Sequence, residues 1–203
     1  MKAVTIIAGG WSARMVDLNR VPGFVIAVND SAVYAPRWDA AISMDRLWFE
    51  NRHEQVLKAG KPLYMRENAI KRPVENGLIH RFACDHESTV LAEPAAHRRL
   101  NGTHSGFCAI NLAYQMRPLE LFLVGFDMSL GPRGERHWYE DYPWNPRGTG
   151  PTRLAEWAMQ FGKAAIQLRD AGVTTHLVES KIGMSIPGWF DVDAEYMERL
   201  CVA

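Results

Sequence analysis

Cysteine is scarce in this sequence, which has only three among 203 residues. Cys84, Cys108 and Cys201 are odd in number and far apart, without the paired spacing of a zinc site or a disulfide framework. No H-E-x-x-H or comparable histidine spacing occurs either. We therefore expect three reduced thiols and no metal site built by the protein.

Long apolar runs and an excess of one charge are also missing. No run approaches the roughly 18 apolar residues of a membrane-spanning helix, and the N-terminus does not resemble a signal peptide. Lys plus Arg and Asp plus Glu both number 23, which argues against a broad basic surface for non-specific nucleic-acid binding. We expect a cytoplasmic protein with one domain over residues 1–203, since this length suffices for one core and a small lid.

What the chain does contain is a regular alternation of short apolar runs and amphipathic segments. Such alternation predicts an α/β, Rossmann-like doubly wound fold, in which a mostly parallel sheet carries helices on both faces. The expected strands span residues 3–8, 23–28, 40–43, 61–65, 77–82, 119–124 and 173–178. Expected helices begin near Ala13 or span 47–59, 107–116 and 154–171, with a short one at the end of the 187–200 tail.

Glycine or polar residues follow several of the expected strands. The first strand runs into a glycine turn from Gly9 to Ser12, the second into Asn29-Asp30, and the third into Asp45. Ligands of open α/β sheets bind beyond the carboxyl ends of the strands, and a glycine turn before a helix can present backbone N–H groups to phosphate. Glycine turns also simply join strands to helices, and Asn29 and Asp45 could instead cap helices.

A second small-residue turn, Asn101 to Gly106, precedes the apolar segment 107–116. Thr103 or Ser105 is suitably placed to cap that helix, and Gly106 allows the backbone to approach a phosphate or a ribose. An ordinary N-cap explains the same residues.

The stretch from Leu119 to Asn145 combines a buried strand with a polar loop. Its apolar run ends at Gly125, and the polar side chains begin with Asp127. The loop or lid that follows, about residues 128–152, is crowded with charged, aromatic and imidazole side chains. This crowding makes the loop the first place to look for function.

His137 is the candidate general base of this loop, because histidine is available in both protonation states near neutral pH. Tyrosine hydroxyls and arginines could stabilise a departing phosphate without a metal ion. His137 and Trp138 could instead pin the loop by packing. The candidate cations are Arg133, Arg136 and Arg147.

Four motifs together support a family resemblance: the glycine turn near the N-terminus, Asn29, the T-x-S-G turn at Thr103, and G-x-D at Gly125. The chain resembles the Rossmann-like bacterial sialyltransferases that use CMP-activated sialic acid, and the related motility-accessory-factor family of glycosyltransferase-like proteins. It also resembles small phage-encoded members of that superfamily, in which the G-x-D loop continues into an H-W segment, here His137-Trp138.

The resemblance implies a metal-independent, nucleotide-sugar-dependent glycosyltransferase that takes a CMP-type donor as substrate and needs no separate cofactor. His137 would act as the general base. The residues that would bind the nucleotide and its phosphate are Gly10, Ser12, Asn29, Asp45, Thr103, Ser105, Gly106, Gly125, Asp127, Tyr139 and Tyr142.

Other classes of function stay open, because fold alone does not fix a reaction. The same crevice could serve a non-catalytic nucleotide- or nucleic-acid-binding phage protein, or another nucleotide-dependent transferase or hydrolase. The aromatic C-terminal segment with Trp189, Phe190 and Tyr196 could belong to the core or to a homo-oligomer surface.

Overall fold

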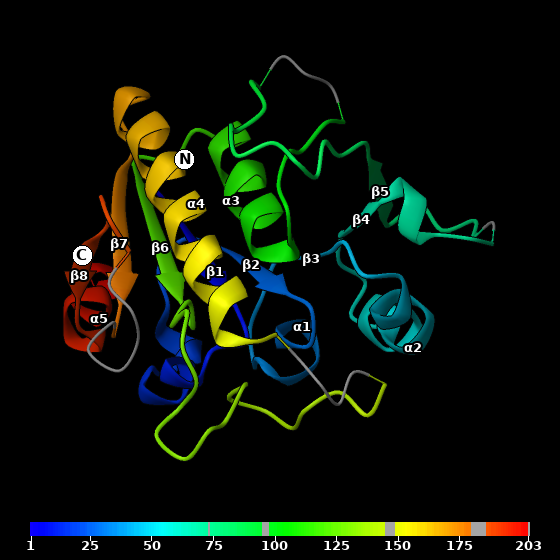
Figure 1. Ribbon diagram of the computed structural model, residues 1–203, viewed down its shortest axis with the longest axis horizontal. Coiled ribbons are helices and arrows are strands. Elements are labelled where there is room, and N and C mark those ends of the chain that lie inside the picture. Colours follow the sequence, from blue (N-terminus) through cyan, green and yellow to red (C-terminus); the bar gives the residue numbers. More distant parts are fainter. Residues whose placement is uncertain (73, 95–97, 145–148, 180–185, 203) are drawn as a thin grey trace.

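The computed structural model describes residues 1–72, 74–94, 98–144, 149–179 and 186–202. Its centre is an eight-stranded sheet of order β5-β4-β3-β2-β1-β6-β7-β8, which runs from right to left in Figure 1. All neighbouring strands pair in parallel. The strands are β1 (Ala3–Ile7), β2 (Phe24–Val28), β3 (Ala40–Ser43), β4 (Leu63–Arg66), β5 (Ile79–Phe82), β6 (Glu120–Val124), β7 (Thr174–Val178) and β8 (Phe190–Val192).

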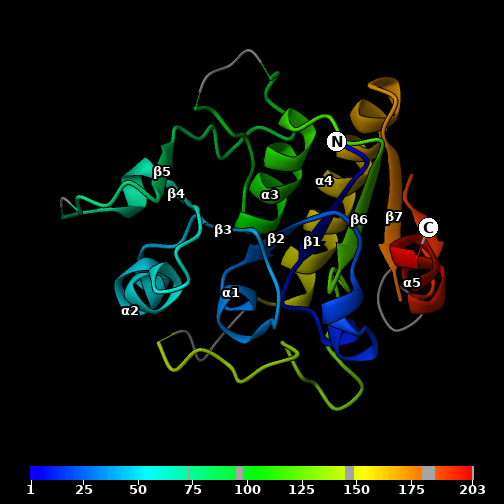
Figure 2. The same cartoon turned by 180° about the vertical axis from the view of Figure 1, so that it is seen from behind.

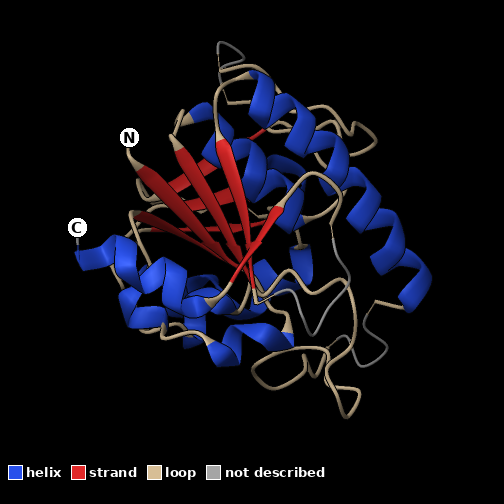
Figure 3. Cartoon of the chain, turned by 90° about the vertical axis from the view of Figure 1, so that its left-hand side faces the viewer, coloured by secondary structure: helices blue, strands red, loops and turns tan. Residues whose placement is uncertain are grey.

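Helices cover both faces of this sheet, as Figure 3 shows. Helices α3 (Ser105–Gln115) and α4 (Pro151–Asp170) pack on one face, in front of the strands in Figure 1. Helices α1 (Ser31–Tyr34), α2 (Arg46–Leu57) and α5 (Ala194–Val202) pack on the other. The predicted α/β Rossmann-like class is therefore confirmed.

The two helix layers explain why the strands read as continuous apolar runs. In β1, Val4 and Ile6 belong to the core cluster under α3 and α4, whereas Ile7 belongs to the cluster on the opposite face. In β6, Leu123 and Val124 divide between the faces in the same way. A strand that is buried on both faces is apolar at nearly every position. The exception in β1 is Thr5, whose buried hydroxyl donates to the Pro22 carbonyl at 2.7 Å.

The order of the strands reverses between β1 and β6. The chain moves outward from β1 to β5, then returns through α3 to place β6 on the other side of β1. Ile7 pairs with Val124 at this point, so the turns that follow the two strands emerge side by side. Such a switch point is where doubly wound folds bind ligands. The loop after β6 crosses the lower end of the sheet in both Figure 1 and Figure 2.

Some local expectations were wrong. The helix expected near Ala13 is a 3-10 helix, Trp11–Met15, and a second one, Leu18–Arg20, follows it. Gly10, which precedes Trp11–Met15, and Ser12 donate their backbone N–H groups to Gly125 and Asp127, which follow β6. Helix α1 and the 3-10 helix Glu67–Ala69 were not predicted, because three or four residues are too few to show a helical period. Strand β8 was not predicted either, because its three residues lack the continuous run of apolar and small residues that marks β3.

The C-terminal aromatics have different environments. Trp189 is buried in the core, and its Nε1 donates to the Phe161 carbonyl at 3.0 Å. Phe190 is 64% exposed.

Across the part of the chain that the structure describes, no helix combines the length and apolarity needed to cross a membrane.

Candidate functional site

Two glycine turns face each other where β1 and β6 end. The Gly10 N–H donates to the Gly125 carbonyl at 2.8 Å, and a Cβ on Gly10 would lie 2.5 Å from that same oxygen. Gly125 has a φ of 72°, in the left-handed region that favours glycine. The turns can approach this closely only because neither residue has a side chain.

Gly10→Ala should lower the free energy of unfolding by about 2 kcal/mol, the cost of overpacking against backbone that cannot move aside. Chemical denaturation measures the difference. Gly77→Ala is the matched control, because no atom lies within 4 Å of a Cβ there, and its stability should change by less than about 0.5 kcal/mol. Equal effects of the two substitutions would contradict the close approach.

Asp127 joins the two turns from the side of β6. One carboxylate oxygen accepts from the Ser12 backbone N–H at 2.8 Å, and the other accepts from the Ser12 hydroxyl. Asp127 is only 5% exposed, so burial raises the pKa of its carboxyl, and the bonds from Ser12 oppose this. The N–H groups of Gly10 and Ser12 thus already donate within the protein, and a phosphate in this turn would have to use other donors.

A cavity of about 490 Å³ opens beside these turns. Its wall combines the exits of β1, β2, β3 and β6 with the start of α3, the loop after β6 and part of α4. All the expected site residues line it except Ser12, which is buried behind the turn. Those on the wall are Gly10, Asn29, Asp45, Thr103, Ser105, Gly106, Gly125, Asp127, His137, Tyr139 and Tyr142.

His137 lies on this wall with its ring stacked on Tyr139, at 5.1 Å between ring centroids. Burial lowers the pKa of the imidazole, and the Asp141 carboxylate and the Gly9 backbone oppose this to a smaller extent. Its buried Nδ1 has no hydrogen-bond partner among the described residues. The imidazole is therefore neutral near pH 7 and has a nitrogen available to a ligand.

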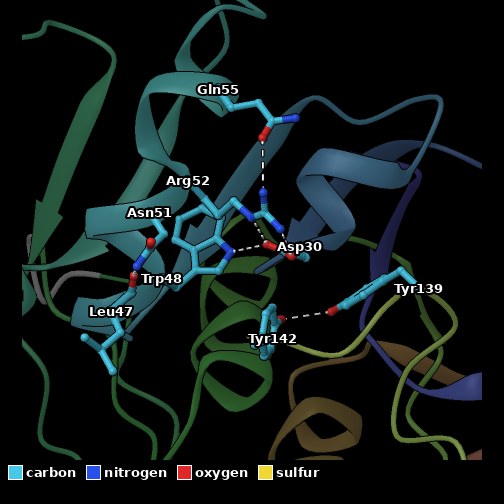
Figure 4. A network of polar contacts seen from close by, with 8 residues as sticks. All are labelled: Asp30, Leu47, Trp48, Asn51, Arg52, Gln55, Tyr139 and Tyr142. Carbon is cyan, nitrogen blue, oxygen red and sulfur yellow. Dashed lines mark hydrogen bonds and ion pairs between the residues drawn. The ribbon is translucent and has the colours of Figure 1, made fainter. Parts of the chain in front are cut away.

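The hydroxyls of Tyr139 and Tyr142 are bonded to each other at 3.0 Å (Figure 4). Burial raises the pKa of both hydroxyls above the ordinary tyrosine value. Both therefore stay protonated at neutral pH and can donate hydrogen bonds. The Tyr139 ring also stacks on Tyr34, at 5.2 Å between centroids.

Trp138 fixes the loop to the end of β1. Its backbone N–H donates to the Gly9 carbonyl at 2.9 Å, and its Nε1 donates to the Ala8 carbonyl at 3.0 Å. Its own carbonyl accepts from Arg14 Nε at 3.0 Å. The pinning role that the sequence left open is confirmed for Trp138, and it brings the neighbouring His137 to the glycine turn.

An ion pair between Asp30 and Arg52 lies beside the two tyrosines (Figure 4). Asp30 is fully buried and accepts from Trp48 Nε1 at 2.8 Å and from Arg52 Nε and Nη2 at 3.2 and 3.1 Å (Figure 4). Burial raises the pKa of the Asp30 carboxyl, and Arg52 opposes this. The Arg52 guanidinium also lies 5.2 Å from the centre of the Trp144 ring, so it connects α2 with the end of the loop.

Asp45 and Asn29 have different local roles. The Asp45 carboxylate accepts from the N–H groups of Leu47 and Trp48 at 2.8 and 3.2 Å, so the capping alternative is correct for Asp45. Asn29 caps no helix through its side chain. It has a φ of 53°, and its buried Oδ1 has no partner within the described ranges. A buried oxygen at a cavity wall is available to a donor on a ligand.

The expected side-chain cap of α3 was wrong. The N-cap residue is His104, whose side chain makes no capping bond. The Thr103 hydroxyl donates instead to Gln160 Oε1 at 2.5 Å, and the Ser105 hydroxyl accepts from the Met44 N–H at 3.0 Å. These contacts tie the start of α3 to α4 and to the end of β3, and its positive end meets the cavity.

His104 is a cavity residue that sequence reasoning missed, because it occupies the variable position of the T-x-S-G turn. Its ring stacks on Trp157 at 4.1 Å and meets Phe161 edge-on at 5.1 Å. Burial lowers the pKa of the imidazole to about 3. Its Nε2 is buried and has no partner in the described part of the protein. It is therefore a permanently neutral group that could bond to a ligand.

The sequence analysis also missed two arginines that line the cavity, Arg46 and Arg66. Arg66 is the last residue of β4, and Arg46 begins α2 three residues after the end of β3, so their place near strand ends is the signal that could have found them. Arg46 pairs with Glu50 at 2.9 Å, and Arg66 has a buried Nε without a partner among the residues described.

The three predicted cations differ in their position relative to the cavity. Arg136 lines the cavity and lies 3.5 Å from Asp141. Arg133 is paired with Glu135 at 2.9 Å and is not on the wall, whereas Arg147 lies outside the described residues. Searching residues 1–72, 74–94, 98–144, 149–179 and 186–202 reveals no group of three or more His, Cys, Asp or Glu side chains arranged to hold a metal ion.

No family model matches the sequence, and no curated protein matches it. Solved structures of one enzyme do match the fold. CstII, a sialyltransferase from Campylobacter jejuni solved with cytidine-5'-monophosphate, is 12% identical with a TM-score of 0.51, over 93% of this chain and 86% of the other.

The same enzyme with the substrate analogue CMP-3FNeuAc is 11% identical with a TM-score of 0.50, over 93% and 87% of the two chains. A variant of CST-II in complex with CMP is 13% identical with a TM-score of 0.51, over 87% and 80%. At these identities the likeness establishes a glycosyltransferase-like fold and no more.

Proposed function

We propose that this chain is a glycosyltransferase that uses a CMP-type nucleotide sugar, works without a metal ion, and has His137 as its general base. The observation that carries the proposal is a neutral histidine beside two protonated tyrosine hydroxyls in a cavity at the switch point of the sheet. The likeness in fold to a sialyltransferase solved with CMP supports a cytidine nucleotide as the first ligand to test.

In the proposed reaction, His137 takes the proton of an acceptor hydroxyl while the acceptor oxygen bonds to the anomeric carbon of the donor sugar. The bond from that carbon to the phosphate oxygen breaks, and the nucleotide leaves with the negative charge. A general base must be unprotonated at the working pH. Because burial lowers the pKa of His137, its imidazole is neutral near pH 7, and one ring nitrogen can accept the proton.

The charge that develops on the leaving phosphate needs donors nearby. The hydrogen-bonded pair Tyr139 and Tyr142 leaves one O–H group to donate, and Arg46, Arg66 and Arg136 supply positive charge around the same cavity. The N-terminal end of α3 adds a partial positive charge. Groups held in place before the reaction stabilise such a charge without reorganising, which is often the largest contribution to catalysis.

CMP should raise the melting temperature, because a ligand that binds only the native state stabilises it, by about 2.7 kcal/mol at one hundred times its dissociation constant. Differential scanning fluorimetry with CMP, UMP, AMP and GMP measures the shift. Unchanged melting temperatures across the whole panel would remove the transferase proposal. Binding without transfer to any acceptor would favour the non-catalytic alternative.

A further inference from the structure

Two cysteines that are 24 positions apart in the chain meet beside the cavity. The Sγ atoms of Cys84 and Cys108 lie 3.9 Å apart, and both residues are free thiols. Cys84 follows β5 and is half-buried, whereas Cys108 is fully buried in α3. We propose that Cys84 and Cys108 form an oxidisable dithiol, in which the Cys84 sulfur attacks hydrogen peroxide and Cys108 then closes the disulfide.

The surroundings give the two thiols different roles. The Cys84 thiol donates to the Gly102 carbonyl at 3.4 Å and is reachable by a small oxidant. Its contact with Cys108 lowers the pKa of the Cys84 thiol, burial opposes this, and the Arg66 guanidinium adds to the lowering. Burial and the same contact raise the pKa of Cys108. Thiolate character and access both favour Cys84 as the first sulfur to be oxidised.

The chemistry balances with peroxide as the oxidant. The Cys84 thiolate attacks one peroxide oxygen, an S–O bond forms, the O–O bond breaks, and hydroxide leaves to become water with the proton that Cys84 had given up. Cys108 then attacks the sulfenic sulfur of Cys84; the S–S bond forms, the S–O bond breaks, and the hydroxide takes the Cys108 proton as a second water. Two thiols are oxidised by two electrons, and peroxide is reduced to two waters.

The fold can supply the movement that closure needs. The sulfur atoms must approach by about 2 Å to reach the length of a disulfide bond. Cys84 lies in the connection between β5 and α3, outside any helix or strand, whereas the Cys108 N–H donates to the His104 carbonyl at the start of α3. The Cys108 sulfur also lies 3.3 Å from Met44 Sδ, and Met44 lines the cavity. The disulfide would therefore form directly behind a residue of the cavity wall.

The test uses the full chain with Cys201→Ser, so that only the two proposed thiols remain. After treatment with hydrogen peroxide and alkylation of free thiols, intact mass should fall by about two daltons with no alkyl group added. Peptide mapping should give one cross-linked pair containing Cys84 and Cys108. Dithiothreitol should restore two alkylatable thiols.

Cys84→Ser in the same background is the matched control, since the half-buried position tolerates a hydroxyl and the buried Cys108 remains. It should show no loss of mass and no cross-link. Gains of oxygen on Cys84 without a cross-link, or two alkylated thiols after peroxide, would overturn the proposal. Neither outcome depends on whether the protein binds a nucleotide.

Discussion

His137→Gln should lower glycosyl transfer by about 10² to 10⁴-fold while leaving the CMP-induced melting shift nearly unchanged, because general-base catalysis contributes about this much. Glutamine keeps a polar side chain of similar reach but cannot accept a proton near neutral pH. The effect should therefore appear in kcat and in kcat/KM alike, since the lost interaction is made only in the transition state. Steady-state kinetics with CMP-sialic acid and a panel of acceptors measures it.

The pH profile gives an independent check of the same role. Burial holds the pKa of His137 below the ordinary histidine value, which is about 6.5. The base works only when it is unprotonated, so activity should rise with pH through this lowered pKa and be level by pH 7. The rise should therefore occur below about pH 6.5, and it should disappear from the residual activity of His137→Gln.

His80→Gln is the matched control, because His80 is exposed on β5 and does not line the cavity. Its kinetics should equal those of the unchanged chain. Equal losses of binding and turnover in His137→Gln would assign the residue to ligand binding or loop packing. That result would favour a binding module over an enzyme.

The layers of the fold were predictable because buried parallel strands leave a local signature. The segment 40–43 was predicted with the bounds that the structure has, since every residue of β3 is buried and every one is apolar or small. The convergence of Asn29, Asp45 and Gly125 on one cavity also followed from the sequence, because parallel strands end at the same edge.

The contacts that hold the cavity together were not predictable in the same way. Ser12 and Asp127 are 115 positions apart, and the sequence indicated two ligand-binding residues where the structure has a bond between them. His104 interrupts a recognisable motif, and only the packing of α4 against it makes it a cavity residue. Side-chain pairings of this kind are decided by tertiary packing and leave no period in the sequence.

Arg52→Met should lower the free energy of unfolding by about 3 kcal/mol at pH 7, because it leaves the buried Asp30 carboxylate without its cation. We expect a loss at the lower end of the range measured for broken buried ion pairs, because the Arg52 side chain is 23% exposed and its charge is partly solvated. Methionine keeps most of the apolar stem, so the loss reports the charge and its hydrogen bonds. Urea denaturation measures the change.

Arg46→Met is the matched control on the same helix, because Arg46 pairs with the exposed Glu50 one turn away. Such a surface pair contributes about 0.5 kcal/mol at most. Comparable losses for Arg46→Met and Arg52→Met would show that the buried pair stabilises the protein no more than the surface pair does.

The pH dependence of this loss identifies Asp30 as its source. The folded-state pKa of Asp30 is raised, so its ionised form destabilises the protein once the pH exceeds the unfolded value of about 3.9. Arg52 reduces that cost, and its removal raises the pKa further. The loss in Arg52→Met should therefore be largest at neutral pH and shrink as the pH falls and Asp30 becomes protonated in both states. A loss that is independent of pH would instead point to the contact between Arg52 and Trp144, which carries no titrating group.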